Sequence, residues 1–274
     1  MRNMKEGTDQ LGTRMKTYEK AGHSCFIKQV PVIIRIDGKA FHTYTRGMKK
    51  PFDERISEAM WGTTKYLCAT MAGCEVGYTQ SDEITLMFIN DENTKSNPIY
   101  NNNKTKLESI SASKATVRFN QVMLQFLLED MVKNGATPQD ISDTLIMQKE
   151  WAEFDSRAFA IPKHEAINNF IWRQQDAVKN SISMVAQANF SHKSLQGLNG
   201  IDMKKRLQHE NNIEWDALPT WQQRGAVIMK TKKTRTATYN GNTFTVMRNV
   251  WEVDHETPIF TEMRDYIDQY VYHE

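Results

Sequence analysis

Long hydrophobic runs are missing from this sequence, and cysteine is scarce. No apolar stretch reaches the roughly 20 residues that a membrane-spanning helix needs, and the charged first 20 residues do not resemble a secretory signal. The 3 cysteines, Cys25, Cys68 and Cys74, form no C-x-x-C pair, which argues against a disulfide framework and a cysteine zinc site. These absences predict a cytoplasmic protein with no membrane partner.

The chain also lacks a strong charge of either sign. Its formal net charge is only +2 over 274 residues, so a nucleic-acid surface has to be a local patch and not a property of the whole protein. Hydrophobic residues make up 39% of the chain, which is enough for a sizeable globular core.

Residues 33–42 carry the first candidate site. The β-branched first half of this stretch is typical of a buried strand, and the run ends at Asp37 followed by Gly38. Glycine lets a backbone turn sharply or approach a ligand closely, and the amides of residues 39–42 can then point at a phosphate. An ordinary Asp-Gly turn is the alternative interpretation.

A second candidate lies at residues 78–88. Apolar residues alternate there after a tight polar turn that contains Asp82, which predicts two strands joined by a hairpin. Residues 52–71, between the two stretches, have the spacing of a helix. If the strands are neighbours, Asp37 and Asp82 meet at one edge of one sheet. Two such carboxylates repel unless a cation separates them, and oxygen ligands favour Mg²⁺ in a two-metal phosphoryl-transfer site.

The rest of the chain alternates between periodic and turn-rich segments. We expect the first helix to be amphipathic through Leu11, Met15 and Tyr18 and to pack on the body. Residues 90–108 and 135–143 predict polar loops. Further expected elements are helices over 109–134, 165–189 and 258–273, broken helices over 190–223, strands over 154–162 and 224–230, and a hairpin at Asn240-Gly241 that returns over 243–253.

Basic and polar residues next to these elements are candidates for phosphate contact. Lys50 stands in a basic loop, for which a solvated surface loop is the alternative, and Asp53 is placed to cap the helix that follows. His42 follows the Asp37 turn and can touch a phosphate or pack in its loop.

Candidates for RNA contact lie further along the chain. Alternation along the predicted strand puts Arg157 and Asp155 on the same face, and Arg173 lies one helical turn before Asp176. A structural ion pair is the alternative interpretation for each arginine. Asn180 is a polar position on the same helix as Arg173 and can face RNA or a nucleotide. The predicted hairpin is basic, and lysines that protect an edge strand are the alternative for its residues Lys230, Lys232, Lys233 and Arg235.

Several of these motifs also carry a family resemblance. The sequence Arg-Ile-Asp-Gly-Lys-Ala-Phe-His at 35–42, together with Ser81-Asp82-Glu83, resembles the signature of the tRNA-His guanylyltransferase family. It is similar in particular to the guanylyltransferase-like proteins of bacteria and archaea, which are 3′-5′ RNA polymerases. Three later stretches resemble family motifs in the same order: Phe154–Arg157, Trp172–Asp176 and Arg224–Val227.

The resemblance implies a fold and a set of site residues. The fold is α/β (α+β), with a polymerase palm-like antiparallel sheet, flanking helices and a C-terminal helical and β-hairpin extension. Residues 1–135 form the catalytic core with the metal site, and residues 136–274 continue the same globular unit. Asp37 and Asp82 are the metal carboxylates, the Gly38 carbonyl is a further metal ligand, and Glu83 supports catalysis. The nucleotide contacts are Asp37, Gly38, Lys39, Ala40, Phe41, His42, Lys50, Asp53, Ser81 and Asp82.

The implied activity is template-dependent 3′-5′ nucleotide addition that repairs the 5′ end of truncated tRNA, with two Mg²⁺ ions and with ATP and GTP as substrates. Eukaryotic tRNA-His enzymes carry His-Ile-Asn-Asn-Leu-Tyr-Asn after the Trp-Arg-Gln motif, whereas Val178–Met184 keeps only Asn180, which favours the like-protein branch. The alternatives are guanosine addition to tRNA-His, a palm-type nucleotidyl cyclase and a non-catalytic RNA-binding protein. The resemblance also suggests a homotetramer.

Overall fold

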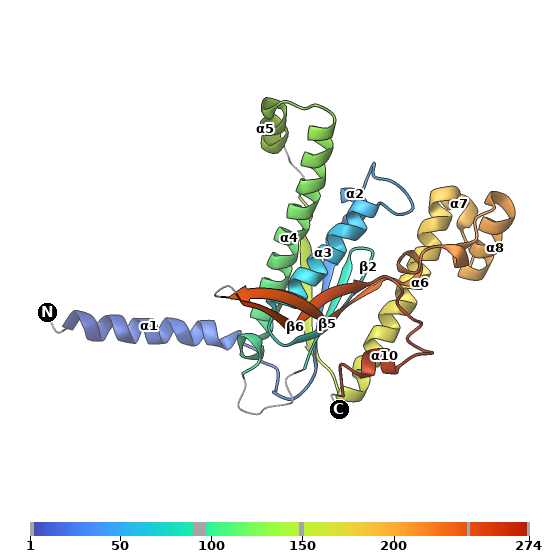
Figure 1. Cartoon of the computed structure of the whole chain (residues 1–274). Coiled ribbons are helices and arrows are strands. Elements are labelled where there is room, and N and C mark those ends of the chain that lie inside the picture. The colour runs from blue at the N-terminus through green and yellow to red at the C-terminus, as the bar shows by residue number, and fades with distance from the viewer. Residues whose placement is uncertain (1–2, 90–96, 148–150, 240–241, 273–274) are drawn as a thin grey trace.

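The computed structural model describes residues 3–89, 97–147, 151–239 and 242–272. A six-stranded sheet with the order β4-β1-β3-β2-β5-β6 organises the molecule (Figure 1). Every neighbouring pair is antiparallel, which confirms the predicted fold class. The strands are β1 (Val32–Gly38), β2 (Cys74–Gln80), β3 (Glu83–Phe88), β4 (Phe154–Ala160), β5 (Ala226–Tyr239) and β6 (Asn242–Asp254). The sheet therefore takes strands from both halves of the chain.

Helices cover both faces of the sheet because successive side chains of a strand point to opposite faces. Ile34 and Ile36 of β1 pack in a cluster with α3 (Glu54–Thr70) and α4 (Lys104–Lys133). Ile33 packs in a second cluster with α6 (Ala166–Asn189) and α10 (Asp265–Asp268). Arg35 and Asp37 alternate with Ile34 and Ile36, so they lie on the α6 face.

The second half of α6 extends past the sheet and builds a smaller helical unit. Ile182, Val185 and Trp215 belong to a third hydrophobic cluster there. The short elements around it are α7 (His192–Leu195), α8 (Gly200–Asn211), the 3-10 helix η3 (Trp215–Ala217) and α9 (Thr220–Arg224), which agree with the predicted broken helices. As a result the first half of α6 packs on the sheet and its second half leads to α7 and α8 (Figure 1).

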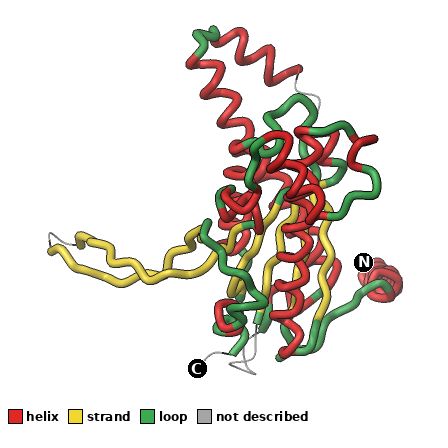
Figure 2. Tube along the Cα trace, turned by 90° about the vertical axis from the view of Figure 1, so that its right-hand side faces the viewer, coloured by secondary structure: helices red, strands yellow, loops and turns green. Residues whose placement is uncertain are grey.

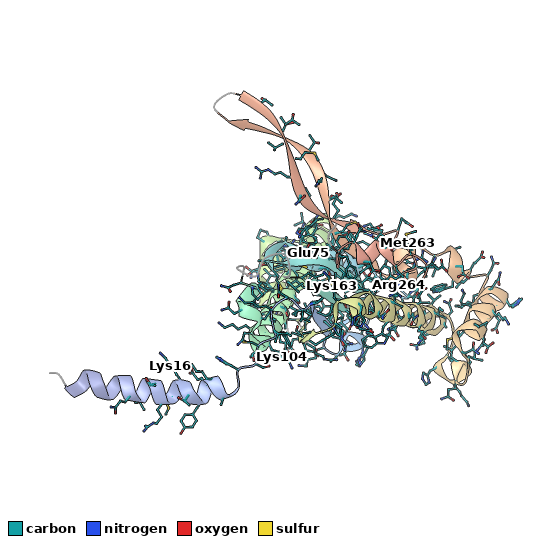
Figure 3. All side chains as sticks on the ribbon, turned by 90° about the horizontal axis from the view of Figure 1, so that it is seen from below. Lys16, Glu75, Lys104, Lys163, Met263 and Arg264 are labelled. Carbon is teal, nitrogen blue, oxygen red and sulfur yellow. The ribbon has the colours of Figure 1, made fainter. Side chains whose placement is uncertain are left out.

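Three parts of the chain project from the body. The helix α1 (Asn3–Ala21) extends to one side, the end of α4 carries α5 (Pro138–Met147), and the β5–β6 hairpin reaches away from the helices (Figure 2). The expectation that α1 packs on the body is wrong, since Leu11, Met15 and Tyr18 are all exposed and Lys16 lies far from the sheet (Figure 3). An amphipathic pattern fixes which face of a helix is apolar, but not which partner covers it.

Several predicted boundaries also shift. The helix α4 begins at Lys104, before the expected residue 109, because the Asn103 side chain caps it by accepting from Lys106 N at 2.9 Å. Residues 138–147 are α5 instead of a loop, and the C-terminal segment forms only the short α10. The Asn240-Gly241 turn lies outside the described residues, although the strands on either side pair as predicted. The remaining short elements are α2 (Phe41–Tyr44), η1 (Ile99–Asn102) and η2 (Lys163–Glu165).

In the part of the chain that the structure describes, no helix combines the length and the apolar character that crossing a membrane requires.

Candidate active site

The two predicted carboxylates meet at one end of the sheet. Asp37 pairs with Glu83 in the β1–β3 register, and Asp82 lies in the tight turn that joins β2 to β3. The Gly38 amide donates to the Asp82 carbonyl oxygen at 3.1 Å, which fixes the end of β1 to this turn. Ser81 has φ of 50°, a left-handed conformation that makes the turn compact. The strand–helix–hairpin order predicted from the sequence therefore brings Asp37 and Asp82 together.

Both carboxylates are held in a setting that disfavours their charge. Burial raises the pKa of Asp37. The charge of Asp155, which faces Asp37 from the adjacent strand β4, raises it further. Burial also raises the pKa of Asp82, with a smaller contribution from Asp37, while a hydrogen bond from Ser81 Oγ at 3.0 Å opposes this rise. Among the described residues, no lysine or arginine forms an ion pair with Asp37 or Asp82. A bound cation would relieve this repulsion.

The donor set at this edge fits magnesium. Asp37 and Asp82 offer hard carboxylate oxygens, and Gly38, directly after Asp37, offers a carbonyl oxygen. Over the described ranges, no group of three or more His, Cys, Asp or Glu side chains forms a ready-made metal cage. Magnesium suits such a partial site because it is usually bound through one or two carboxylates, with water and substrate phosphates completing its shell.

The segment after Asp37 turns back closely on itself. Ala40 has φ of 52°, and α2 begins next to it without a side-chain cap. The Phe41 ring is buried against Tyr44, Phe119 and Phe154, with ring centroids 5.2–5.4 Å apart. A β-carbon built on Gly38 would lie 2.2 Å from Cδ2 of Phe41, so only glycine fits this approach. The anchored Phe41 ring thus sets the path of residues 38–42.

The Gly38→Ala variant is expected to lose roughly 1–3 kcal/mol of unfolding free energy, the usual cost of overpacking, and to bind nucleotide more weakly because the loop must shift. The matched control is Gly62→Ala in α3, where the nearest atom outside the helix is 3.8 Å away and alanine favours the helix. Urea unfolding and nucleotide titration check both variants. Equal stability of the two variants would contradict the packing argument.

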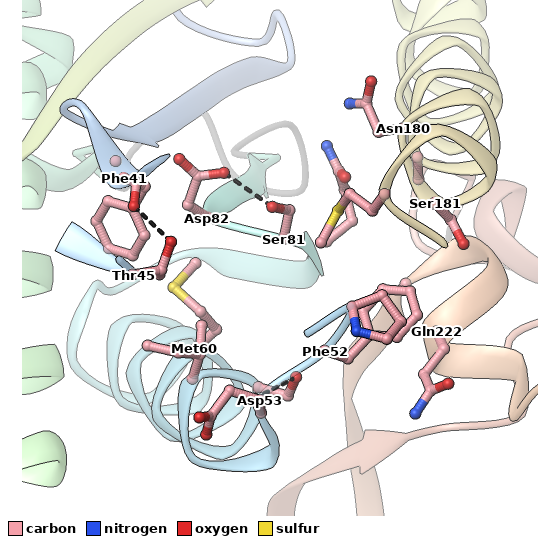
Figure 4. Close-up of a pocket in the computed structure, with 18 of the residues that line it drawn as sticks. Phe41, Thr45, Phe52, Asp53, Met60, Ser81, Asp82, Asn180, Ser181 and Gln222 are labelled. Atoms are coloured by element: carbon pink, nitrogen blue, oxygen red, sulfur yellow. Dashed lines mark hydrogen bonds between the residues drawn. The ribbon is translucent and has the colours of Figure 1, made fainter. Parts of the chain in front are cut away.

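A cavity of about 560 Å³ opens beside the carboxylates. Figure 4 shows Asp82 and Ser81 on one side of it and Asn180 and Ser181 of α6 on the other. Nine of the residues predicted to bind nucleotide line it: Asp37, Gly38, Ala40, Phe41, His42, Lys50, Asp53, Ser81 and Asp82. Asn180, predicted to contact RNA, also lines this cavity. A space of this size and polarity is typical of a small-molecule site.

Asp53 has two structural partners at the cavity wall. It caps α3, as predicted, by accepting from Arg55 N at 3.1 Å, and its carboxylate pairs with Arg55 Nη2 at 2.8 Å. The Arg55 hydrogen bond is the main cause that lowers the pKa of Asp53. This carboxylate therefore stays charged, in contrast to the raised pKa values of Asp37 and Asp82.

Two predicted site residues point elsewhere. The Lys39 side chain is exposed and pairs with Glu153, so it does not line the cavity. Glu83 is buried, and its Oε2 accepts from Arg173 Nη1 at 2.7 Å. Glu83 thus has a protein cation as its partner, which gives it a supporting position behind Asp37.

The predicted RNA contact of Arg173 needs correction. Its side chain is only 6% exposed because the guanidinium is held between Glu83 and Asp176, at 2.7 and 3.5 Å. A buried charge stays in the interior when a partner compensates it. Arg173 therefore supports the site from within and does not present a surface for RNA.

The other basic candidates keep exposed positions of different kinds. Arg157 is exposed and lies 3.6 Å from Asp155. Lys230 pairs with Glu75 at 3.0 Å, Lys233 pairs with Glu252, and Lys232 is exposed on β5. Arg235 lies on β5, but its side chain is outside the described residues. Arg157 lies on β4, whereas the other four residues lie on β5, whose hairpin with β6 projects from the body (Figure 2). None of those whose side chains the structure describes lines the cavity described above.

Sequence reasoning missed one wall of the cavity. The aromatic rings of Phe52, Trp61 and Trp221 meet there. The centroid of the Trp221 ring lies 6.1 Å from that of Phe52 and 5.1 Å from that of Trp61. Phe52 lies between Lys50 and Asp53, which are both predicted to contact nucleotide, so its place in the chain could have indicated its role. Trp221 comes from α9, and no local pattern connects it to the first 90 residues of the chain.

Comparison with known proteins places this arrangement in a family. The sequence profile of the tRNAHis guanylyltransferase family matches residues 12–162. An uncharacterized protein of Acanthamoeba polyphaga mimivirus is 32% identical over 231 residues, covering 81% of this chain and 77% of the relative. The tRNA(His) guanylyltransferase of Candida glabrata is 25% identical over 189 residues, covering 68% and 71%.

Solved structures agree over nearly the whole chain. A bacterial tRNA(His) guanylyltransferase-like protein in complex with ATP is 44% identical and has a TM-score of 0.79, covering 96% of this chain and 99% of the other. The corresponding complex with GTP is 42% identical, with a TM-score of 0.75 and the same coverage. The Saccharomyces cerevisiae enzyme shares the fold, with a TM-score of 0.60, 19% identity and coverage of 82% and 92%. The chain belongs to the tRNAHis guanylyltransferase family of tRNA nucleotidyltransferases.

Proposed function

We propose that this protein adds nucleotides in the 3′-5′ direction to the 5′ end of truncated tRNA, using the opposite strand as template. The observation that carries the proposal is the pair Asp37 and Asp82, which opens onto a cavity large enough for a nucleoside triphosphate. The 44% identity to a bacterial like-protein, against 19% to the yeast enzyme, supports the like-protein branch over guanosine addition to tRNA-His.

The incoming triphosphate is proposed to lie between residues 37–42 and the Ser81–Asp82 turn. Lys50 adds a positive charge at the cavity wall, and Asn180 faces the same space from α6. When bound, two Mg²⁺ ions held by Asp37, Asp82 and the Gly38 carbonyl would neutralise phosphate charge and favour ionisation of the attacking hydroxyl. The protein's own part is to position the reacting groups, which is the main requirement of phosphoryl transfer.

The proposed chemistry has two steps. In the first, an oxygen of the RNA 5′-monophosphate attacks the α-phosphorus of ATP, pyrophosphate leaves, and an adenylylated 5′ end forms. In the second, the 3′-hydroxyl of the incoming nucleotide attacks that 5′ phosphate, AMP leaves, and the hydroxyl proton passes to solvent. The RNA then ends in a 5′-triphosphate, so the next addition releases pyrophosphate and needs no new ATP.

The RNA is proposed to contact exposed basic groups outside the cavity. Arg157 lies beside Asp37 on the sheet, and Lys232 extends from the hairpin. The expected homotetramer stays a proposal, for which the exposed apolar side of α1, with Leu11, Met15 and Tyr18, supplies a surface. A cytoplasmic location is likewise proposed, from the cysteine pattern alone.

The test is extension of a 5′-monophosphorylated tRNA that lacks its first nucleotide. The protein is mixed with Mg²⁺, ATP and all four nucleotides, and the 5′ end is resolved at single-nucleotide length. We expect addition of the nucleotide that pairs with the opposing acceptor-strand base, and a change of that base should change the nucleotide added. Addition of guanosine whatever the opposing base would overturn the template-dependent proposal.

Two parallel reactions separate the alternatives. The guanylyltransferase reaction is tested with otherwise intact tRNA-His that lacks only its additional 5′ guanosine. The cyclase reaction is tested with nucleotides in the absence of RNA. A cyclic product formed without RNA, with no extension of any tRNA, would replace the proposal by the cyclase. If the protein binds nucleotide but extends no RNA and forms no cyclic product, the non-catalytic RNA-binding protein is the remaining alternative.

A further inference from the structure

A cationic and aromatic surface lies next to the carboxylates but outside the cavity. On the α6 face of the sheet, Arg35 of β1 stands directly opposite Arg157 of β4, two residues along the strands from the pair Asp37 and Asp155. Like charges that face each other across two strands destabilise the pair. In the described chain Arg35 forms no ion pair, and Arg157 reaches only Asp155, at 3.6 Å. Two opposed guanidinium groups are favourable where an anion binds between them.

Trp172 of α6 completes this surface. Its side chain is 49% exposed, which is unusual for the largest aromatic residue on a helix that packs against a sheet. The Arg173 guanidinium carbon lies 3.5 Å from the centre of the indole ring, and that of Arg35 lies 5.8 Å from it. These cations contact part of the ring and leave half of the side chain open to solvent.

The indole is held in place from behind. Arg173 cannot move freely, because its guanidinium is fixed by buried Glu83 at 2.7 Å. Its Nε and Glu83 Oε1 are buried without a hydrogen-bond partner among the described residues, and the face of the guanidinium lies against the ring. A rigid aromatic face backed by a fixed cation costs little entropy when another flat group stacks on it.

The position of this surface suits one partner of the reaction. The cavity is lined by the second half of α6, from Ala177 onward, and Trp172 does not line it. The carboxylate Asp37 is common to both regions, since it lines the cavity and lies two residues after Arg35 on β1, beside Arg157 of β4. With a nucleotide in the cavity, the side of Arg35, Arg157 and Trp172 offers the second reactant a cationic approach to Asp37.

We propose that Trp172 is a stacking platform for the base at the end of the RNA, with Arg35 and Arg157 holding the phosphate of that nucleotide. The inference rests on the proposed function and names the surface that positions the RNA 5′ end at Asp37. Aromatic stacking tolerates any base, because every base has a π-face. The platform therefore fits an enzyme that takes its sequence from a template and not from its own side chains.

The test compares Trp172→Ala and Trp172→Phe with Tyr66→Ala. Tyr66 is a matched control, because it is a partly exposed aromatic residue flanked by Lys114 and Arg118, at 5.2 and 5.9 Å, on the opposite face of the sheet. Fluorescence anisotropy of a 3′-labelled truncated tRNA gives the Kd for RNA. Equilibrium dialysis with ATP gives the nucleotide Kd independently.

The Kd for RNA is expected to rise about tenfold in Trp172→Ala, the size of one lost stacking contact. It should stay within about twofold of wild type in Trp172→Phe and Tyr66→Ala, with the ATP Kd unchanged in all three. Wild-type RNA affinity in Trp172→Ala, or equal weakening in Tyr66→Ala, overturns the platform and leaves the proposed function intact. Wild-type protein that binds no RNA overturns both.

Discussion

Asp82→Asn is expected to abolish nucleotide addition and at the same time to make the metal-free protein more stable at neutral pH. The activity should fall by more than about a hundredfold, since loss of a residue that only supports a metal ligand already costs roughly 10–100-fold. The gain in stability follows from the raised pKa of Asp82, which reflects burial of a charged group.

The sign of the stability change depends on pH. The folded state of the wild-type protein binds the Asp82 proton more tightly than the unfolded state does, so its stability decreases as the pH rises from the unfolded pKa through the raised folded pKa. Asparagine carries no charge at any pH and keeps an oxygen that accepts from Ser81. The advantage of the variant should therefore be full near neutral pH and vanish in acid.

The matched control is Asp53→Asn in the same cavity. The pKa of Asp53 is lowered by its Arg55 hydrogen bond, so this carboxylate stabilises the fold above its unfolded pKa and the variant should lose stability at neutral pH. Thermal unfolding of both variants, from acid to neutral pH without metal, checks the opposite signs. A loss of stability in Asp82→Asn at neutral pH would contradict the account of the carboxylates as a strained cation site.

Arg173→Met is expected to cost roughly 3–5 kcal/mol of unfolding free energy, the usual effect of removing one partner of a buried ion pair. The reason is that the side chain of Glu83 is only 9% exposed and would be left without its cation. Burial already raises the pKa of Glu83, and Arg173 is the main group that opposes this rise, with a smaller contribution from Arg35. Without Arg173, the carboxyl would have to take up a proton or the local structure would have to open.

A double-mutant cycle with Glu83→Gln measures the pair. The Arg173→Met/Glu83→Gln protein should be more stable than Arg173→Met alone, because no unpaired charge remains in the interior. Urea unfolding of the four proteins gives the coupling free energy. Independent, additive losses would show that the contact at 2.7 Å contributes nothing to the fold. The exposed pair Lys204 and Asp216 serves as control, where the same cycle should give about 1 kcal/mol or less.

The sequence by itself determined much of the sheet end that carries Asp37 and Asp82. Alternating apolar residues fixed which side chains of each strand face the core, and the strand–helix–hairpin order left few ways to pair the strands. Asp37 ends one strand and Asp82 lies in the turn between two others, so the sequence predicted that they meet if the strands are neighbours, and the pairing of β1 with β3 confirms this. The cap at Asp53 could be read in the same way, because capping needs only the next few residues.

Only the tertiary structure decided which distant segments complete the site. Trp221 and Asn180 reach the cavity because α9 packs against α6, and helical periodicity does not say which end of a helix faces a site. The same limit hid the burial of Arg173, whose charge is compatible with a surface until Glu83 is seen beside it. It also left α1 without its partner, because a hydrophobic stripe records that a surface is to be buried and not where.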